Sequence, residues 1–310
     1  MNKFAEWLTA RPIRSLFAGT VLAVLALIAL PVLAWLPAGL VVLGLLATGS
    51  GAATLAAAGA ALPIAWGFSP VIGLGGGLVV AAAVLVPAYL AGSLLVHSRS
   101  LSVAFQAVTL AACALVLLVR LVLGDPTGVL MPLLDVFRPA LEETARALAG
   151  LGVERTPEEI GEATARVAWA TGAWMLLLHT MTSLFAGLWA FAAMREPGLF
   201  GRQFRGLRLG SLVAWAAMGA LLVSFATQWA SGRAWAPAED VLFVLAGAFL
   251  LQALAVVHGL RATQAIGPVL VAMAYVGVLL VPMALVGLGF ADTWVRFRDR
   301  FGARPGASQG

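Results

Sequence analysis

Long apolar runs separated by short polar links dominate the sequence. A helix needs about 20 mostly apolar residues to cross the hydrocarbon core of a bilayer, and many of these runs approach or exceed that length. The first run begins at Leu16, continues past Val42 and contains Pro31 and Pro37, so we divide it into two spans. The predicted spans are 15–35, 38–50, 52–68, 72–95, 102–123, 166–194, 209–229 and 240–260. The pattern predicts an all-α polytopic transmembrane helical bundle of about eight to ten membrane segments.

A last apolar stretch, 265–294, is interrupted by Pro282. Lysine and arginine collect in cytoplasmic loops of membrane proteins, and the earlier loops obey this rule if the N-terminus is cytoplasmic. A single crossing by 265–294 would place the arginine-rich tail outside, against the rule. A division at Pro282 into two short helices keeps this polar C-terminal tail, 296–310, in the cytoplasm. We favour the division, and one long crossing is the alternative.

Residues 124–165 hold eight acidic side chains against three basic ones. We expect this segment to be an extramembrane helical insertion on the periplasmic side. Apolar residues in its first half recur at helical spacing, a pattern that suits a helix lying on the bilayer surface. The sequence from Thr156 to Glu159 then has the form of a capping box, with proline at the first helical position. It predicts a helix that continues without a break to about Met194.

Composition points to the same environment. Of 310 residues, 62% are hydrophobic and 11% are charged, whereas soluble domains are about 25% charged. The single cysteine excludes a disulfide scaffold. The net charge is +5, but no basic stripe with interleaved aromatic residues indicates nucleic-acid binding. We expect a single integral membrane domain over 1–310, embedded in the lipid bilayer, and interpret its basic start as a retained first helix.

Polar side chains inside apolar spans are costly and are therefore candidates for function. His179 and Thr182 lie in the sixth predicted span, and Gln252 and His258 lie in the eighth. Hydrogen bonding between helices explains such residues equally well. No metal-ligand spacing, catalytic order or cofactor motif accompanies them, so neither an enzyme activity nor a cofactor is predicted.

Three further patterns predict local contacts. The glycine-rich piece Gly73–Gly77 has the G-x-x-x-G spacing that lets helices approach closely. Arg120, near the end of the fifth span, is expected to pair with Asp125. Asp292 and Arg296 stand in the i,i+4 order that favours an ion pair.

Two segments, the loop 197–209 and the tail 287–298, are richer in composition than membrane topology alone requires. Together with the Ser98-Arg99-Ser100-Leu101 link and His258, they resemble the YybS-like family of predicted bacterial inner-membrane proteins, which is grouped under a domain of unknown function. The resemblance covers most of the chain. The positions that carry it include Arg99, Pro197, Gly198, Phe204, Arg205, Arg208, Asp292, Trp294 and Arg298.

This resemblance implies a multi-pass protein of the bacterial inner membrane, remotely similar to the substrate-binding S-components of energy-coupling-factor vitamin transporters. The chain departs from the family at Leu188-Trp189-Ala190-Phe191, where an Arg-Trp-Trp-Gln-like run is usual. It also has Arg296 where the family often has a second acid before the Phe-Arg of the tail. Roles that depend on those polar groups do not carry over.

Two functions fit these patterns. The first is small-molecule binding or transport, in a cavity between helices lined by His179, Thr182, Gln252 and His258. The second is a non-catalytic scaffold or assembly factor that docks protein partners through the acidic insertion and the basic inner loops. Substitution of His179 or His258 should abolish binding under the first, and charge reversal at Arg205 and Arg208 should disrupt docking under the second.

Overall fold

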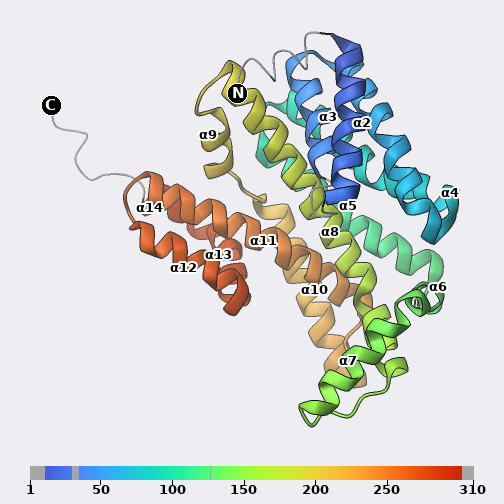
Figure 1. Ribbon diagram of the computed structural model, residues 1–310. Coiled ribbons are helices and arrows are strands. Elements are labelled where there is room, and N and C mark those ends of the chain that lie inside the picture. The colour runs from blue at the N-terminus through green and yellow to red at the C-terminus, as the bar shows by residue number, and fades with distance from the viewer. Residues whose placement is uncertain (1–10, 30–34, 126, 302–310) are drawn as a thin grey trace. The chain divides into compact units, whose positions relative to one another are not determined.

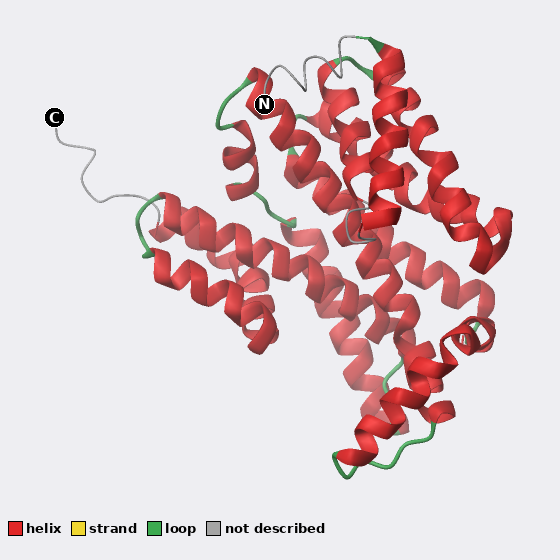
Figure 2. Cartoon of the chain, in the orientation of Figure 1, coloured by secondary structure: helices red, strands yellow, loops and turns green. Residues whose placement is uncertain are grey.

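The computed structural model of the chain describes residues 11–29, 35–125 and 127–301 (Figure 1). Helices account for nearly all of these residues, and the described part contains no strand (Figure 2). Five of the described helices are long and apolar enough to cross a membrane, and a bent pair near the C-terminus makes a sixth candidate. The fold is therefore an all-α, multi-pass membrane bundle, which confirms the class predicted from the apolar runs.

The helices lie close to the predicted spans, with fewer full-length crossings because the first two are short and the third and fourth are joined. In chain order they are α2 (Pro12–Ala29), α3 (Trp35–Ala47), α4 (Ser50–Ser98), α5 (Leu101–Leu123), α6 (Thr127–Leu134), the 3₁₀ turn η2 (Asp135–Phe137), α7 (Arg138–Gly150), α8 (Pro157–Arg195), α9 (Leu199–Arg205), α10 (Gly210–Ser231), α11 (Ala236–Ala262), α12 (Pro268–Leu280), α13 (Pro282–Val295) and α14 (Phe297–Phe301).

The chain divides into two compact units. Unit 1 consists of residues 1–110, 176–214 and 246–310, and unit 2 consists of residues 111–175 and 215–245. Helices α5, α8, α10 and α11 each contribute to both. The predicted acidic insertion, 124–165, falls within unit 2. Residues 1–10 of the basic start and residues 302–310 of the predicted tail lie outside the described residues.

Within unit 1, α4 contains both the third and the fourth predicted span. Gly73 interrupts its helical backbone with φ 72 and ψ 167, a positive φ that glycine adopts without steric cost. A Cβ atom at Gly77 would lie 2.1 Å from the carbonyl oxygen of Ala65. In a straight helix residues 65 and 77 would be about 18 Å apart, so the chain turns back at Gly73. Close packing is thereby confirmed at Gly77, whereas Gly73 makes the turn.

Helices α12 and α13 form a second hairpin, with a bend of 116° at Val281. Pro282 begins α13, and because proline has no backbone N–H it cannot continue the hydrogen bonding of α12. The two helices have 13 and 14 residues, or about 20 Å each, which is shorter than the ~30 Å hydrocarbon core. The predicted division of the last apolar stretch into two short helices is confirmed.

In unit 2, α8 starts at the predicted capping box. The Thr156 hydroxyl accepts a bond from the Glu159 backbone N–H, and the Glu159 carboxylate accepts one from the Thr156 N–H, both at 3.2 Å. These reciprocal bonds satisfy two donors that the first helical turn leaves free. The helix then runs unbroken to Arg195, as predicted.

Helix α7 lies alongside the start of α8 (Figure 1). Its half-buried residues, Leu141, Ala145 and Leu148, share one side of the helix. Leu141 Cδ1 lies 3.6 Å from the position of a Cβ on Gly161. Arg138 also binds Glu158, at 3.0 Å. Leu141 thus packs toward α8, and the expectation that the apolar side of this segment rests on the bilayer stays a prediction.

Candidate functional site

The centre of unit 1 is a buried glutamine on α11. Gln252 is fully buried, and its side-chain oxygen accepts a hydrogen bond from the Leu209 N–H at 2.7 Å. Its amide nitrogen donates to the Gly289 carbonyl oxygen at 2.8 Å and, at 3.4 Å, to the Asp292 carboxylate. Gln252 therefore joins α11 to the segment before α10 and to α13. A buried amide with these bonds is a structural tie, because leaving its partners unsatisfied is costly.

A buried ion pair continues this cluster. Arg298 binds Asp292 at 2.5 Å, with the arginine side chain 8% exposed and the aspartate fully buried. The same guanidinium donates to the carbonyl oxygens of Arg205, at 2.6 Å, and Leu207, at 3.0 Å. We call this set the junction; it consists of the Gln252, Asp292 and Arg298 side chains and the backbone groups that they bind at Arg205, Leu207, Leu209 and Gly289.

Two glycines give the junction its space. A Cβ at Gly289 would lie 2.0 Å from the Phe249 carbonyl oxygen, so α13 and α11 approach as closely as their backbones allow. A Cβ at Gly259 would lie 2.8 Å from Cδ of Arg298. The lack of a side chain at Gly289 therefore lets α13 approach α11, and its lack at Gly259 leaves room for the Arg298 side chain.

The predicted ion pair between Asp292 and Arg296 is wrong. Asp292 binds Arg298, and the expected i,i+4 partner, Arg296, is not its partner. Arg296 lies just beyond the end of α13, with φ 52, so the helical geometry that the prediction assumed has already ended. This left-handed residue turns the chain and brings Arg298 back over Asp292.

The polar link before α5, and the first turn of α5, bind α9 and the segment that follows it. Gln203 donates to the Arg99 carbonyl oxygen at 3.0 Å and accepts from the Leu101 N–H at 3.1 Å. The Ser102 hydroxyl accepts from the Arg208 N–H at 3.1 Å. The three segments singled out in the sequence, around residues 98–101, 197–209 and 287–298, thus meet in unit 1.

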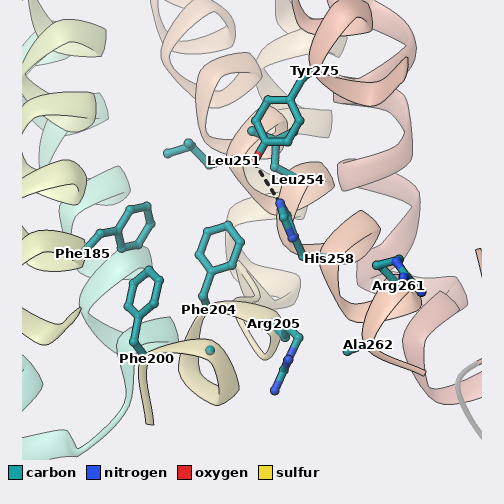
Figure 3. Close-up of a pocket in the computed structure, with 11 residues that line it drawn as sticks. Phe185, Phe200, Phe204, Arg205, Leu251, Leu254, His258, Arg261, Ala262 and Tyr275 are labelled. Atoms are coloured by element: carbon teal, nitrogen blue, oxygen red, sulfur yellow. Dashed lines mark hydrogen bonds between the residues drawn. The ribbon is translucent and has the colours of Figure 1, made fainter. Parts of the chain in front are cut away.

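A pocket of about 560 Å³ lies next to the junction (Figure 3). Its aromatic wall is continuous: the ring centroid of Phe204 is 5.4 Å from that of Phe185, 5.9 Å from that of Phe200 and 5.6 Å from that of His258. His258 Nε2 is 2.8 Å from the Tyr275 hydroxyl, which comes from α12. The remaining lining residues are Gly201, Arg205, Leu251, Leu254, Arg261 and Ala262.

Of the four predicted ligand residues, His258 lines this pocket and the other three do not. Gln252 belongs to the junction. His179 is half-buried on α8, and its Nε2 is buried without a hydrogen-bond partner. Thr182 is half-buried one turn before Phe185. The single cavity expected to hold all four is therefore not formed around His258.

Three of the other predicted signature residues lie at helix boundaries, and Trp294 lies near the end of α13. Gly198, with φ 88, starts α9, and Pro197 precedes it between α8 and α9. Arg99 ends α4 in a left-handed conformation with φ 54. Trp294 packs edge-on against Phe290, with ring centroids 4.7 Å apart.

Sequence reasoning missed Phe185, Gln203 and Tyr275. Tyr275 carried a usable signal, since a tyrosine in an otherwise apolar helix needs a partner for its hydroxyl. Phe185 carried no such signal, because it is one apolar residue among many in this sequence.

Two arginines at and beside the junction, Arg298 and Arg208, have carboxylate partners. Burial lowers the pKa of Arg298, and the Asp292 carboxylate acts against that shift. Outside the buried cluster, Arg208 binds Asp299 at 2.7 Å, and this bond lowers the pKa of Asp299 from its ordinary value. No group of three metal-binding side chains occurs among the described residues.

Unit 2 holds a separate polar site at the end of α5. Arg120 binds Asp240 at 2.7 Å, with both side chains largely buried, and lies 3.5 Å from Asp125, whose side chain is 72% exposed. The predicted contact with Asp125 is confirmed, but the shorter bond to Asp240 was missed. A pocket of about 590 Å³ adjoins this site, with Arg120, Asp125 and Trp235 among its lining residues.

No family model matches the chain, and comparisons with curated proteins and with solved structures find no match either.

Proposed function

We propose that this multi-pass membrane protein binds a small molecule in the pocket around His258 and serves as the binding component of a transport system in the bacterial inner membrane. The observation that carries the proposal is the His258–Tyr275 pair, which stands beside three phenylalanine rings in a 560 Å³ pocket. It combines a polar pair that can orient a ligand with a surface that can bury one.

The size and lining of the pocket support this assignment. Ligand sites commonly have volumes of about 300–1,000 Å³, are mainly apolar, and contain a few polar groups that fix orientation. The aromatic wall supplies the apolar part, and His258, Tyr275 and the arginines supply the polar part. The resemblance to the YybS-like family, and its remote similarity to S-components, are consistent with such a role.

The test is a thermal-shift screen of the full chain in mild detergent against vitamins, nucleobases, amino acids and lipid precursors. A ligand that binds only the folded state stabilises it by about 2.7 kcal/mol at 100 times its Kd. We expect a saturable rise in the melting temperature for the native sequence and loss of that rise in His258→Ala.

A matched histidine provides the control. His97 is exposed, and its ring nitrogen bonds the Ser93 carbonyl oxygen at the end of α4, so His97→Ala should respond like the native chain. A shift retained in His258→Ala would place the ligand elsewhere. No shift across the panel, with known binders responding in parallel, would contradict binding and favour the scaffold.

A scaffold that docks protein partners is the second candidate function. The substitutions at Arg205 and Arg208 are poorly suited to test it. Charge reversal at Arg208 breaks its ion pair with Asp299, and charge reversal at Arg205 alters a residue that lines the His258 pocket. Arg195, an exposed residue at the end of α8, is a cleaner position at which to reverse charge. Partner cross-linking that Arg195→Glu abolishes would support docking.

A further inference from the structure

We infer that the ligand of the His258 pocket is an amphipathic anion, with its acidic group between Arg205 and Arg261 and its apolar part against the wall formed by Phe185, Phe200 and Phe204. This inference rests on the proposed function and names the chemical class of the ligand. A phosphate or carboxylate attached to an apolar body has this chemistry, whether it comes from a membrane lipid or from a soluble molecule.

The first support is an unbalanced charge at the pocket. Two arginines line it, Arg205 and Arg261, and no aspartate or glutamate does. Among the described residues, neither guanidinium forms an ion pair.

Three other arginines of unit 1, in contrast, each bind a carboxylate. Arg298 binds Asp292, Arg208 binds Asp299 and Arg202 binds Glu196, and none of these three arginines lines the pocket. Two exposed arginines that line the pocket are therefore left without a carboxylate partner among the described residues, and an anion is the ligand that would balance their charge.

The second support is the separation of apolar and charged groups. In Figure 3, Phe185 and Phe200 lie on one side of His258, while Arg205 and Arg261 lie away from them. Phe204 bridges the two parts, because its ring contacts both Phe185 and His258. A molecule that fills this pocket therefore meets aromatic rings at one end and guanidinium groups at the other.

The third support is that the protein holds the cationic edge in place. Arg205 is the last residue of α9, and its carbonyl oxygen accepts a 2.6 Å hydrogen bond from buried Arg298. The backbone from which its side chain projects is thus tied to the junction. Arg261 projects from the last turn of α11, one turn after His258. Arginine suits this role because its guanidinium binds phosphate and carboxylate in a bidentate manner.

The experiment compares two matched pairs of probes on the full chain in neutral detergent. The soluble pair is 2-naphthyl phosphate against 2-naphthol, and the lipid pair is phosphatidylglycerol against phosphatidylcholine in mixed micelles. Saturable thermal shifts give the affinities. We expect at least one anionic probe to bind about tenfold more tightly than its uncharged or zwitterionic partner, a difference that corresponds to about 1.4 kcal/mol.

Substitutions then test which residues cause the preference for the anionic probe. Arg205→Gln and Arg261→Gln should each reduce the affinity for the anion about threefold, and together they should abolish the tenfold preference. Arg195→Gln removes one positive charge outside the pocket and should leave affinity unchanged. If Arg205→Gln does not fold, Arg261→Gln, at an exposed position, still tests the prediction.

The outcomes separate this inference from the proposed function. One outcome is binding that requires His258 but is the same for charged and uncharged probes, or the same with and without the two arginines. This outcome would overturn the inference that the ligand is an anion, and the proposed binding site would stand. Absence of binding by all four probes would overturn the anion, whereas the proposed function is contradicted only if the broader ligand panel also gives no shift. Preference for naphthyl phosphate alone would indicate a soluble ligand, and preference for phosphatidylglycerol alone would indicate a lipid.

Discussion

Each unit of this protein contains a buried arginine–aspartate pair, and the two pairs have different surroundings. In unit 1, Arg298 and fully buried Asp292 are enclosed by Gln252 and by backbone carbonyls. In unit 2, Arg120 and Asp240 are almost as buried, but Arg120 also reaches exposed Asp125 and lines a 590 Å³ pocket. The same chemical pair thus closes a helix junction in one unit and borders an opening in the other.

The difference shows that the neighbours of a buried ion pair decide its role. A charge taken out of water is stable only when a partner and further hydrogen bonds replace its hydration. Arg298 obtains those bonds from Arg205 and Leu207. Arg120 obtains a weaker one, at 3.4 Å, from the Arg166 carbonyl oxygen. The first pair should therefore be the more sensitive to substitution.

The largest expected effect is that of Asp292→Ala. Removal of this carboxylate leaves Arg298 buried without its counter-charge, which costs about 3–5 kcal/mol. The measurement is the free energy of unfolding by denaturant titration in detergent. A double variant, Asp292→Leu with Arg298→Met, removes both charges and should recover most of the loss. Equal losses in the single and double variants would contradict a role for the uncompensated charge.

Arg120→Ala tests the second pair in the same assay. It leaves Asp240 without its partner, and we expect a loss of about 3 kcal/mol, the low end for a broken buried pair, because the adjoining pocket can admit water. Asp125→Ala is the internal comparison. Asp125 is largely exposed, so its loss should cost less than about 1 kcal/mol. A larger loss of stability for Asp125→Ala than for Arg120→Ala would contradict the expectation that Asp240 is the main partner of Arg120.

Gln252→Leu should cost about 2 kcal/mol, because the Leu209 N–H and the Gly289 carbonyl oxygen lose their buried partner. The loss should be accompanied by easier proteolysis of the α12–α13 hairpin, since Gln252 ties α11 to α13. A change confined to global stability, with the hairpin cleaved at its original rate, would show that Gln252 does not tie the hairpin.

The smallest expected effect concerns the exposed pair beside the junction. Binding to Arg208 holds the pKa of Asp299 below its ordinary value of 3.8. The folded state therefore binds this proton less readily than the unfolded state, and the stabilisation is complete above pH 3.8 and is lost as the pH falls through the lower folded value. Melting temperatures measured from pH 5 downward should show the native chain converging on Asp299→Asn. A constant difference between the two would exclude this contribution.

Much of the fold could be predicted because its signals are local. The capping bonds of Thr156 and Glu159 connect residues three apart, and Pro282 marks the break between α12 and α13 through its own missing N–H. Gly73 is different, because the sequence placed it in a packing motif and gave no indication that it would adopt a positive φ.

The site was less predictable because its contacts join distant segments. The sequence identified Asp292, Arg298 and Gln252 as separate features, but their contact depends on the left-handed turn at Arg296 and on α11 lying against α13. His258 was predicted as a ligand residue, while its partner Tyr275 lies seventeen residues away on another helix. Helical periodicity reports which residues share a face of one helix, and it carries no information about the neighbouring helix.

The short hairpin α12–α13 has a consequence for the order of assembly. Its bond to Gln252, and the bonds of Arg298 in the following α14 to Arg205 and Leu207, all reach residues that come earlier in the chain. Chains emerge from the ribosome N-terminus first, so these acceptors and donors are already synthesised when the hairpin appears. Arg298 thus binds carbonyl oxygens of residues synthesised 93 and 91 positions before it, so its contacts join the late segment to one made much earlier.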